Sequence, residues 1–138
     1  MKNFLRLSFI FAIIFNSVSC NEREEENLIQ EVTRVEIDSI TVQTDTMSLG
    51  TTLSFKTYSN YVSKCEGFYG YDYLYTNDFT RTVTSYKFKT SVACGEPTTR
   101  FSLINFRPQK AGNYLFRFFK RKNDASQTEW IEKRITVN

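Results

Sequence analysis

The last third of the chain constrains its fold most strongly, because three runs of alternating apolar residues lie there between turn signals. In the middle run, Tyr114, Phe116 and Phe118 occupy every second position. In a β-strand this spacing places all three side chains on one face. The runs on either side, residues 101–106 and 129–137, follow the same period. The pattern predicts the closing strands of an antiparallel β-sandwich.

Similar runs recur along the rest of the chain and give about seven strands in all. Aromatic residues make up 16% of the sequence, which favours strands over disorder. A length of 138 residues supports one domain with a single two-layer core. This pattern is typical of an immunoglobulin-like antiparallel β-sandwich, an all-β fold. The predicted strands lie near residues 32–43, 51–58, 67–75, 80–89, 99–106, 112–120 and 129–137, with a polar loop at residues 60–64.

The first of these runs changes phase in its middle. Val35 and Ile37 share one parity, whereas Ile40 and Val42 share the other. One extra residue near Ser39 would turn the apolar side chains toward the opposite face. We therefore expect a β-bulge here, or a first strand that switches sheets.

Residues 1–19 have the parts of a cleaved export signal: basic residues near the start, an apolar stretch and small residues at the end. The apolar stretch is shorter than the roughly 20 residues that a membrane-spanning helix needs. The sequence Ser-Val-Ser-Cys at residues 17–20 resembles the lipobox of bacterial lipoproteins, which implies that Cys20 is acylated and anchors the chain in the outer membrane. The same residues also fit an ordinary secretory cleavage site, which would leave a soluble exported protein with a spare thiol.

Residues 20–31 are acidic and free of aromatic side chains, with five Glu and one Arg. Such a segment has too little apolar surface to fold, so we expect a flexible tether. Its position after Cys20 resembles the signal that sends lipoproteins of Bacteroidetes-type bacteria to the outer face of the outer membrane. A merely solvated spacer is the alternative. The domain that follows, residues 32–138, carries 15 basic and 10 acidic residues, so the tether and the domain have opposite charges.

The chain has three cysteines, and lipidation of Cys20 would leave Cys65 and Cys94 as a pair. An exported chain enters an oxidising compartment, which favours a disulfide bond between them over two free thiols. The sequence Ala-Gly-Asn-Tyr at residues 111–114 resembles the tyrosine corner of immunoglobulin-like folds. That resemblance implies a hydrogen bond from the Tyr114 hydroxyl to a backbone group just upstream. A plain core tyrosine is the alternative.

The third predicted strand carries a tyrosine at every second position: Tyr69, Tyr71, Tyr73 and Tyr75. In a regular strand all four project from one face. If that face is exposed, the row forms an aromatic platform for a glycan or for another protein. Packing across the sheet or under a loop is the alternative.

The next predicted strand carries three cations on one side: Arg81, Lys87 and Lys89. They either flank an anionic ligand or protect an exposed strand from pairing at its edge. The chain has no His, which removes the usual general base and the usual zinc ligand. It also has no glycine-rich phosphate loop and no basic helix. We expect no catalytic residue, no metal site, no cofactor and no nucleic-acid partner.

Residues 40–137 resemble small surface lipoproteins of Bacteroidetes-type bacteria that contain an immunoglobulin-like domain. The resemblance lies in a cysteine before an aromatic-rich strand, a second cysteine about 30 residues later, and an ending of the form Phe106-x-Pro108, Gly112-x-Tyr114-x-Phe116-x-Phe118. It supports the fold and the bridge between Cys65 and Cys94. It carries no catalytic residues and implies no ligand.

These observations favour a non-enzymatic binding or adhesion module on the cell surface, anchored to the membrane by lipid. Its ligand would be a glycan or a protein. The main alternative is a structural or accessory lipoprotein subunit of an envelope complex on the periplasmic face. An inhibitor of secreted proteases is less favoured, because the loops at residues 60–65 and 120–128 match no inhibitory motif.

Overall fold

The computed structural model describes residues 28–138, which form β-strands and no helix. The export signal, Cys20 and most of the predicted tether lie outside the described residues. Within the described range, no helix is long and apolar enough to cross a membrane. The strands are β1 (Ile29–Val35), β2 (Ser39–Val42), β3 (Thr46–Met47), β4 (Leu53–Val62), β5 (Glu66–Tyr75), β6 (Thr80–Thr90), β7 (Pro97–Phe106), β8 (Gly112–Lys122) and β9 (Thr128–Val137).

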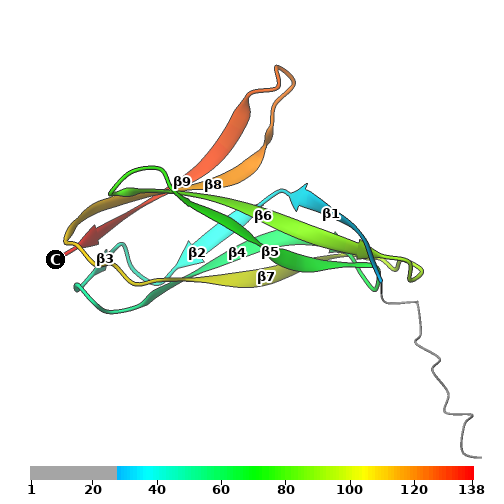
Figure 1. Cartoon of the computed structure of the whole chain (residues 1–138), viewed down its shortest axis with the longest axis horizontal. Helices are drawn as coiled ribbons and strands as arrows, with labels where there is room; N and C mark the ends of the chain where they lie inside the picture. The colour runs from blue at the N-terminus through cyan, green and yellow to red at the C-terminus, as the bar shows by residue number, and fades with distance from the viewer. Residues whose placement is uncertain (1–27) are drawn as a thin grey trace, which may run out of the picture.

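The strands of residues 28–138 form two sheets, which confirms the prediction of an all-β chain with a two-layer core (Figure 1). The larger sheet has the order β1-β6-β8-β9-β3, and β5 also pairs with β6. The smaller sheet has the order β2-β4-β7. The prediction of purely antiparallel pairing is wrong at two places, because β6 pairs with β8 and β3 pairs with β9 in parallel.

The first predicted strand is two strands in different sheets, so the predicted sheet switch is confirmed. β1 ends at Val35 and pairs with β6, whereas β2 begins at Ser39 and pairs with β4. Between them, Ile37 lies in the core with 0% exposure, and its N–H donates to the carbonyl of Phe119 at 3.2 Å. The start of β1 at Ile29 places the first strand partly inside the segment predicted as tether.

The core lies between the two sheets and is dominated by phenylalanine. Phe55 of β4 packs against Phe116 and Phe118 of β8, with ring centroids 4.5 Å and 5.6 Å apart. All three rings are fully buried. Burying one such side chain stabilises a fold by about 1.5–3 kcal/mol. The face predicted from the alternation along β8 is therefore the core face.

Cys65 and Cys94 form the predicted disulfide bond. The end of β6 is held beside the bridge, because the N–H of Thr90 donates to the carbonyl of Cys65 at 2.8 Å. The prediction of a loop at residues 60–64 is wrong for residues 60–62. β4 continues to Val62, since its alternation of buried and exposed side chains runs on without a break.

β6 runs the length of the sandwich and joins its two ends (Figure 1). Its last residue, Thr90, faces Ile29 at the start of β1. We call this end, with Ile29, Thr90, Cys65 and Cys94, the disulfide pole. The other end contains the β5–β6 turn, the β7–β8 loop and the C-terminus, and we call it the far pole. At about 3.3 Å per residue, β6 spans roughly 33 Å between the poles.

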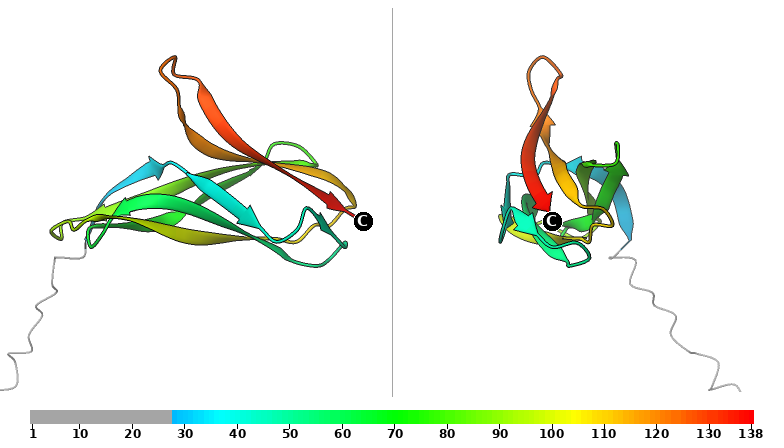
Figure 2. Two further views of the ribbon diagram at one scale, coloured as in Figure 1. Left: turned by 180° about the vertical axis from the view of Figure 1, so that it is seen from behind. Right: turned by 90° about the vertical axis from the view of Figure 1, so that its left-hand side faces the viewer.

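The outer part of the β8–β9 hairpin projects from the body of the sandwich (Figure 2). β6 pairs with β8 only as far as Val83 and pairs with β1 from Ser85 onward. The rest of β8 therefore keeps β9 as its partner. Within this projecting part, the ring of Trp130 packs edge-on against Phe119, and the guanidinium of Arg117 lies 4.9 Å from the Trp130 ring centroid.

Replacing Phe116 with alanine should lower the free energy of unfolding by about 3–5 kcal/mol, because it leaves a cavity among packed rings. Urea unfolding of the two proteins measures this difference. Phe101→Ala is the matched control, because Phe101 is 55% exposed on the opposite face of the smaller sheet. Its effect should stay within about 0.5 kcal/mol. Equal losses in both variants would contradict the assignment of the core.

Replacing both Cys65 and Cys94 with serine should lower the free energy of unfolding by about 3–4 kcal/mol, since the bridge restricts the unfolded chain. The measurement is urea unfolding, with reduced wild-type protein as the control. Non-reducing peptide mapping should also find the two cysteine peptides joined. Free alkylation of both thiols in the unfolded, unreduced protein would rule out the bridge.

Candidate binding site

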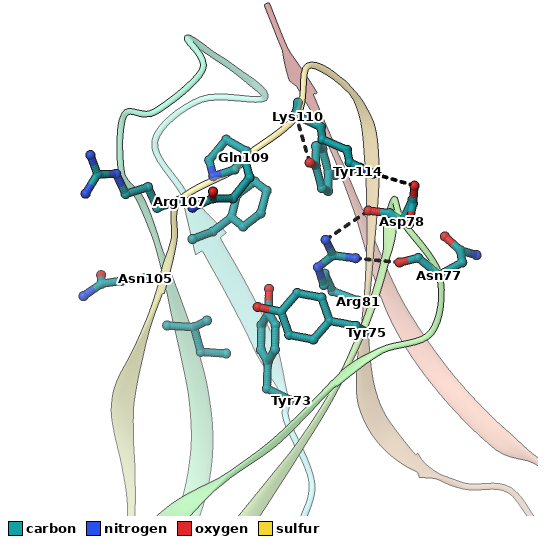
Figure 3. Close-up of a pocket in the computed structure, with 13 residues that line it drawn as sticks. Tyr73, Tyr75, Asn77, Asp78, Arg81, Asn105, Arg107, Gln109, Lys110 and Tyr114 are labelled. Carbon is teal, nitrogen blue, oxygen red and sulfur yellow. Dashed lines mark hydrogen bonds and ion pairs between the residues drawn. The ribbon is translucent and has the colours of Figure 1, made fainter.

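The far pole holds a cavity of about 560 Å³ between the β5–β6 turn and the β7–β8 loop (Figure 3). A cavity of this size lies within the range of small-ligand sites. One wall comes from β5, β6 and their turn, and the other comes from the end of β7 and the loop after it. The side chains that matter for its chemistry are Tyr73, Tyr75, Arg81, Phe106, Lys110 and Tyr114.

The pairing of β5 with β6 brings the two tyrosines and the arginine to the same side of the larger sheet. Tyr73 faces Val83, and Tyr75 faces Arg81. Val83 is fully buried in the core, so the side chains that share its parity also point between the sheets. Near the end of the sheet, the side chains on this face line the cavity. The adjoining turn is fixed by the N–H of Phe79, which donates to Asn77 Oδ1 at 2.9 Å.

Arg81 is a buried cation at the wall of the cavity, with only 6% of its surface exposed. Its Nη1 donates to the carbonyls of Asn77 at 2.8 Å and Thr80 at 3.1 Å, and its Nη2 donates to the carbonyl of Asp78 at 3.0 Å. Its Nε is buried and has no hydrogen-bond partner. Among residues 28–138, no carboxylate forms an ion pair with this guanidinium.

Two aromatic faces supplement the carbonyl partners of Arg81. The centre of its guanidinium lies 4.3 Å from the ring centroid of Tyr75 and 5.2 Å from that of Tyr114. A ring face attracts a nearby cation, because its electron density is concentrated above and below the ring. The β5–β6 turn and these two rings thus stabilise the buried charge without neutralising it.

Tyr114 ties the loop wall to the core. Its hydroxyl donates to the carbonyl of Lys110 at 2.9 Å, which is the hydrogen bond that a tyrosine corner predicts. The ring packs edge-on against Phe79 and Phe106 at centroid distances of 5.1 Å and 4.9 Å. Gly112 precedes it with φ +148°, and a Cβ there would overlap the Phe79 ring. The loop is therefore held close to the β5–β6 turn.

An ion pair joins the two walls at the mouth of the cavity. Lys110 Nζ lies 2.9 Å from Asp78 Oδ2 (Figure 3). The hydrogen bond from Lys110 lowers the pKa of the Asp78 carboxyl, and the same bond raises the pKa of the Lys110 amine. Both side chains are more than half exposed. Exposed pairs of this kind contribute little to stability, so the mouth can open at small cost.

The tyrosine row is not one exposed platform. A bulge between Phe68 and Gly70 interrupts the alternation, and Tyr69 at the bulge is 57% exposed, away from the cavity. Tyr71 points between the sheets, where its hydroxyl and that of Thr57 share a hydrogen bond of 2.6 Å. Tyr71 therefore packs between the sheets and is not part of an exposed platform. The cavity contains the other two, Tyr73 and Tyr75, and Tyr75 is 72% exposed.

The three cations of β6 do not come together, so the idea that they jointly flank an anion is wrong. Arg81 is buried at the far pole. Lys87 lies toward the disulfide pole and pairs with Glu66 Oε1 at 2.6 Å. Lys89 is exposed beyond it. Strand geometry separates residues six positions apart by roughly 20 Å, which is too far for one small ligand.

Burial between the sheets suppresses ionisation of the cavity tyrosine. Loss of solvent raises the pKa of Tyr73 to about 12, although the positive charge of Arg81 opposes the rise. Burial also raises the pKa of Tyr61 and Tyr71. At neutral pH the hydroxyl of Tyr73 is therefore a neutral hydrogen-bonding group beside a permanent cation.

Among residues 28–138, no group of three or more Cys, Asp or Glu side chains is arranged to hold a metal ion. Comparison of the chain with family models, with curated proteins and with solved structures found no match.

Sequence reasoning found the tyrosines of the cavity but missed the loop wall. Phe106 and Lys110 belong to a wall that forms only when β7 and β8 join different sheets. The inward position of Arg81 did have a signal, because Arg81 shares the parity of Val83 and Ser85. Both of these neighbours are buried.

At alkaline pH the protein should lose stability between about pH 10, the pKa of an unfolded tyrosine, and about pH 12, the pKa of Tyr73 in the fold. The neutral phenol is favoured in the fold, so its stabilisation is complete below the lower pKa and disappears as pH rises through the higher one. Urea unfolding across this range measures the loss, and tyrosinate absorbance follows the ionisation.

Tyr73→Phe should lose less stability at alkaline pH than the wild type does. It should also lack the hydroxyl that ionises near pH 12. Tyr69→Phe, on the same strand but outside the cavity, is the matched control. An unchanged alkaline titration in Tyr73→Phe would contradict the burial of this hydroxyl.

Proposed function

We propose that the protein is a lipid-anchored binding module of the cell envelope, with an immunoglobulin-like domain on the outer face of the outer membrane. The tyrosine-corner hydrogen bond of Tyr114 supports the immunoglobulin-like assignment. The recognition site is the cavity at the far pole. No residue of the cavity is assigned a catalytic role.

One observation carries this proposal: the cavity lies at the end of the sandwich opposite the start of the domain. The predicted anchor at Cys20 and most of the acidic tether precede Ile29, which lies at the disulfide pole. A chain anchored there presents the far pole away from the membrane. The length of β6 adds roughly 33 Å to the reach of the tether. Tethering at one end and recognition at the other is a common arrangement in binding domains, whose contact loops cluster at one end of a sandwich.

A second function, as a subunit of an envelope complex, is favoured by a different surface. The outer face of the smaller sheet exposes Phe101 by 55% and Leu103 by 52%, beside Tyr58. Within the described chain β7 pairs only with β4, so its other edge is open. Exposed apolar side chains next to an open strand edge are typical of protein-contact surfaces.

Protease treatment of intact producing cells distinguishes the two functions. If the domain faces outward, the protease removes it while a periplasmic control protein survives. Cys20→Ala should release the chain from the membrane fraction, because it removes the site of acylation. Protection of the domain until the outer membrane is broken would contradict surface exposure. A fixed partner that co-purifies with the chain in detergent would then support the function as a subunit of an envelope complex.

A further inference from the structure

The far-pole cavity contains a positive charge that the described chain does not neutralise. A buried arginine is normally paired with a carboxylate, because removing a charge from water is costly. The nearest acidic side chain in the cavity wall, Asp78, bonds to Lys110 through its carboxylate and offers Arg81 only its backbone carbonyl. Arg81 thus lacks the partner that buried guanidinium groups usually have.

Arg81 has unused hydrogen-bonding capacity at Nε, which lies beside the Nη2 that donates to the carbonyl of Asp78. Three of its five N–H groups donate to carbonyls of the turn. Nε has no partner. Nε and Nη2 form one edge of the guanidinium, and such an edge binds a carboxylate through two parallel hydrogen bonds. We propose that the cavity binds a carboxylate-bearing sugar, such as a uronic or sialic acid residue of a glycan, with its carboxylate on Arg81. This inference rests on the proposed function as a binding module.

The tyrosines on the same wall as Arg81 fit the ring of such a sugar. Tyr73 and Tyr75 place their hydroxyl ends toward the open space beside Arg81 (Figure 3). These hydroxyls can exchange hydrogen bonds with sugar hydroxyls, and the exposed ring of Tyr75 offers an apolar face for the C–H side of the sugar. Lys110 at the mouth is paired with Asp78, whereas Arg81 has no carboxylate partner among residues 28–138. The charge and the aromatic surface thus lie next to each other on one wall of the cavity.

Solvent does not reach the Nε of Arg81, so binding requires a side-chain movement. Tyr75 stacks on the guanidinium at 4.3 Å and is 72% exposed. Rotation of this ring gives up little buried surface, because the side chain is already largely exposed. The ligand exchanges one cation–aromatic contact for a charge-assisted pair, which is the stronger interaction.

Calorimetric titration of the full chain in detergent with D-glucuronate tests the inference. The probe should bind, and its methyl ester, which has the same ring without the charge, should bind at least tenfold more weakly. Acetate, which has the charge without the ring, should also bind at least tenfold more weakly. N-acetylneuraminate, titrated in parallel, distinguishes a uronic acid site from a sialic acid site. Equal binding of the acid and its ester would overturn the role of Arg81. Equal binding of glucuronate and acetate would overturn the proposal that the site recognises the sugar ring.

Variants locate the site on the protein. Arg81→Gln should weaken binding of the acid at least tenfold and leave the weak binding of the ester unchanged. Because Arg81 also holds the β5–β6 turn, Tyr75→Ala provides a second variant at an exposed position, and it should weaken binding at least fivefold. Tyr69→Ala, exposed on the same strand but outside the cavity, is the matched control and should bind as the wild type does. Loss of binding in Tyr69→Ala, or full binding in Tyr75→Ala, would overturn the assignment.

The inference and the proposed function can fail separately. If neither acid binds while protease treatment places the domain outside the cell, the carboxylate inference is wrong and the surface module remains. If an acid binds while the domain is protected in intact cells, the site is correct and the surface location is wrong.

Discussion

The sandwich depends on the packing of Phe55 of the smaller sheet against Phe116 and Phe118 of the larger one. These rings fill the space between the sheets near the start of β4. Toward the disulfide pole the inward row of β4 becomes polar at Thr57 and Ser59, and the bridge and its hydrogen bonds close that end. Toward the far pole no covalent bond closes the sandwich, and the cavity lies there. The aromatic core holds the sheets together, so one end of the sandwich can be closed by a disulfide while the other end holds a cavity.

The far pole combines features that stability alone does not explain. A buried guanidinium without a carboxylate costs free energy, even with carbonyl and aromatic partners. An apolar side chain at position 81 would pack beside Tyr75 and Tyr114 without that cost. Buried, unneutralised charge next to a cavity is a recurring property of functional sites. The same reasoning does not apply to Lys87, whose pairing with Glu66 is complete.

The regular parts of the fold could be predicted from the sequence, because period and turn chemistry are local. The alternation along β8, the phase change before Ser39 and the pairing of the two later cysteines all depend on few residues. The parallel pairs and the loop wall of the cavity could not be predicted, since they depend on which sheet each strand joins. The bulge at Tyr69 shows the same limit, because it takes Tyr69 off the face on which a strict two-residue period places it with the other three tyrosines.

The central claim is that Arg81 keeps a hydrogen-bonding edge for an anionic ligand. The most direct measurement is the NMR signal of the Arg81 Nε–H in the full chain, assigned by its loss in Arg81→Gln. The account predicts that D-glucuronate shifts this signal in a saturable way, whereas the methyl ester does not. A signal that stays unchanged at saturating glucuronate, or that moves equally with both compounds, would contradict it.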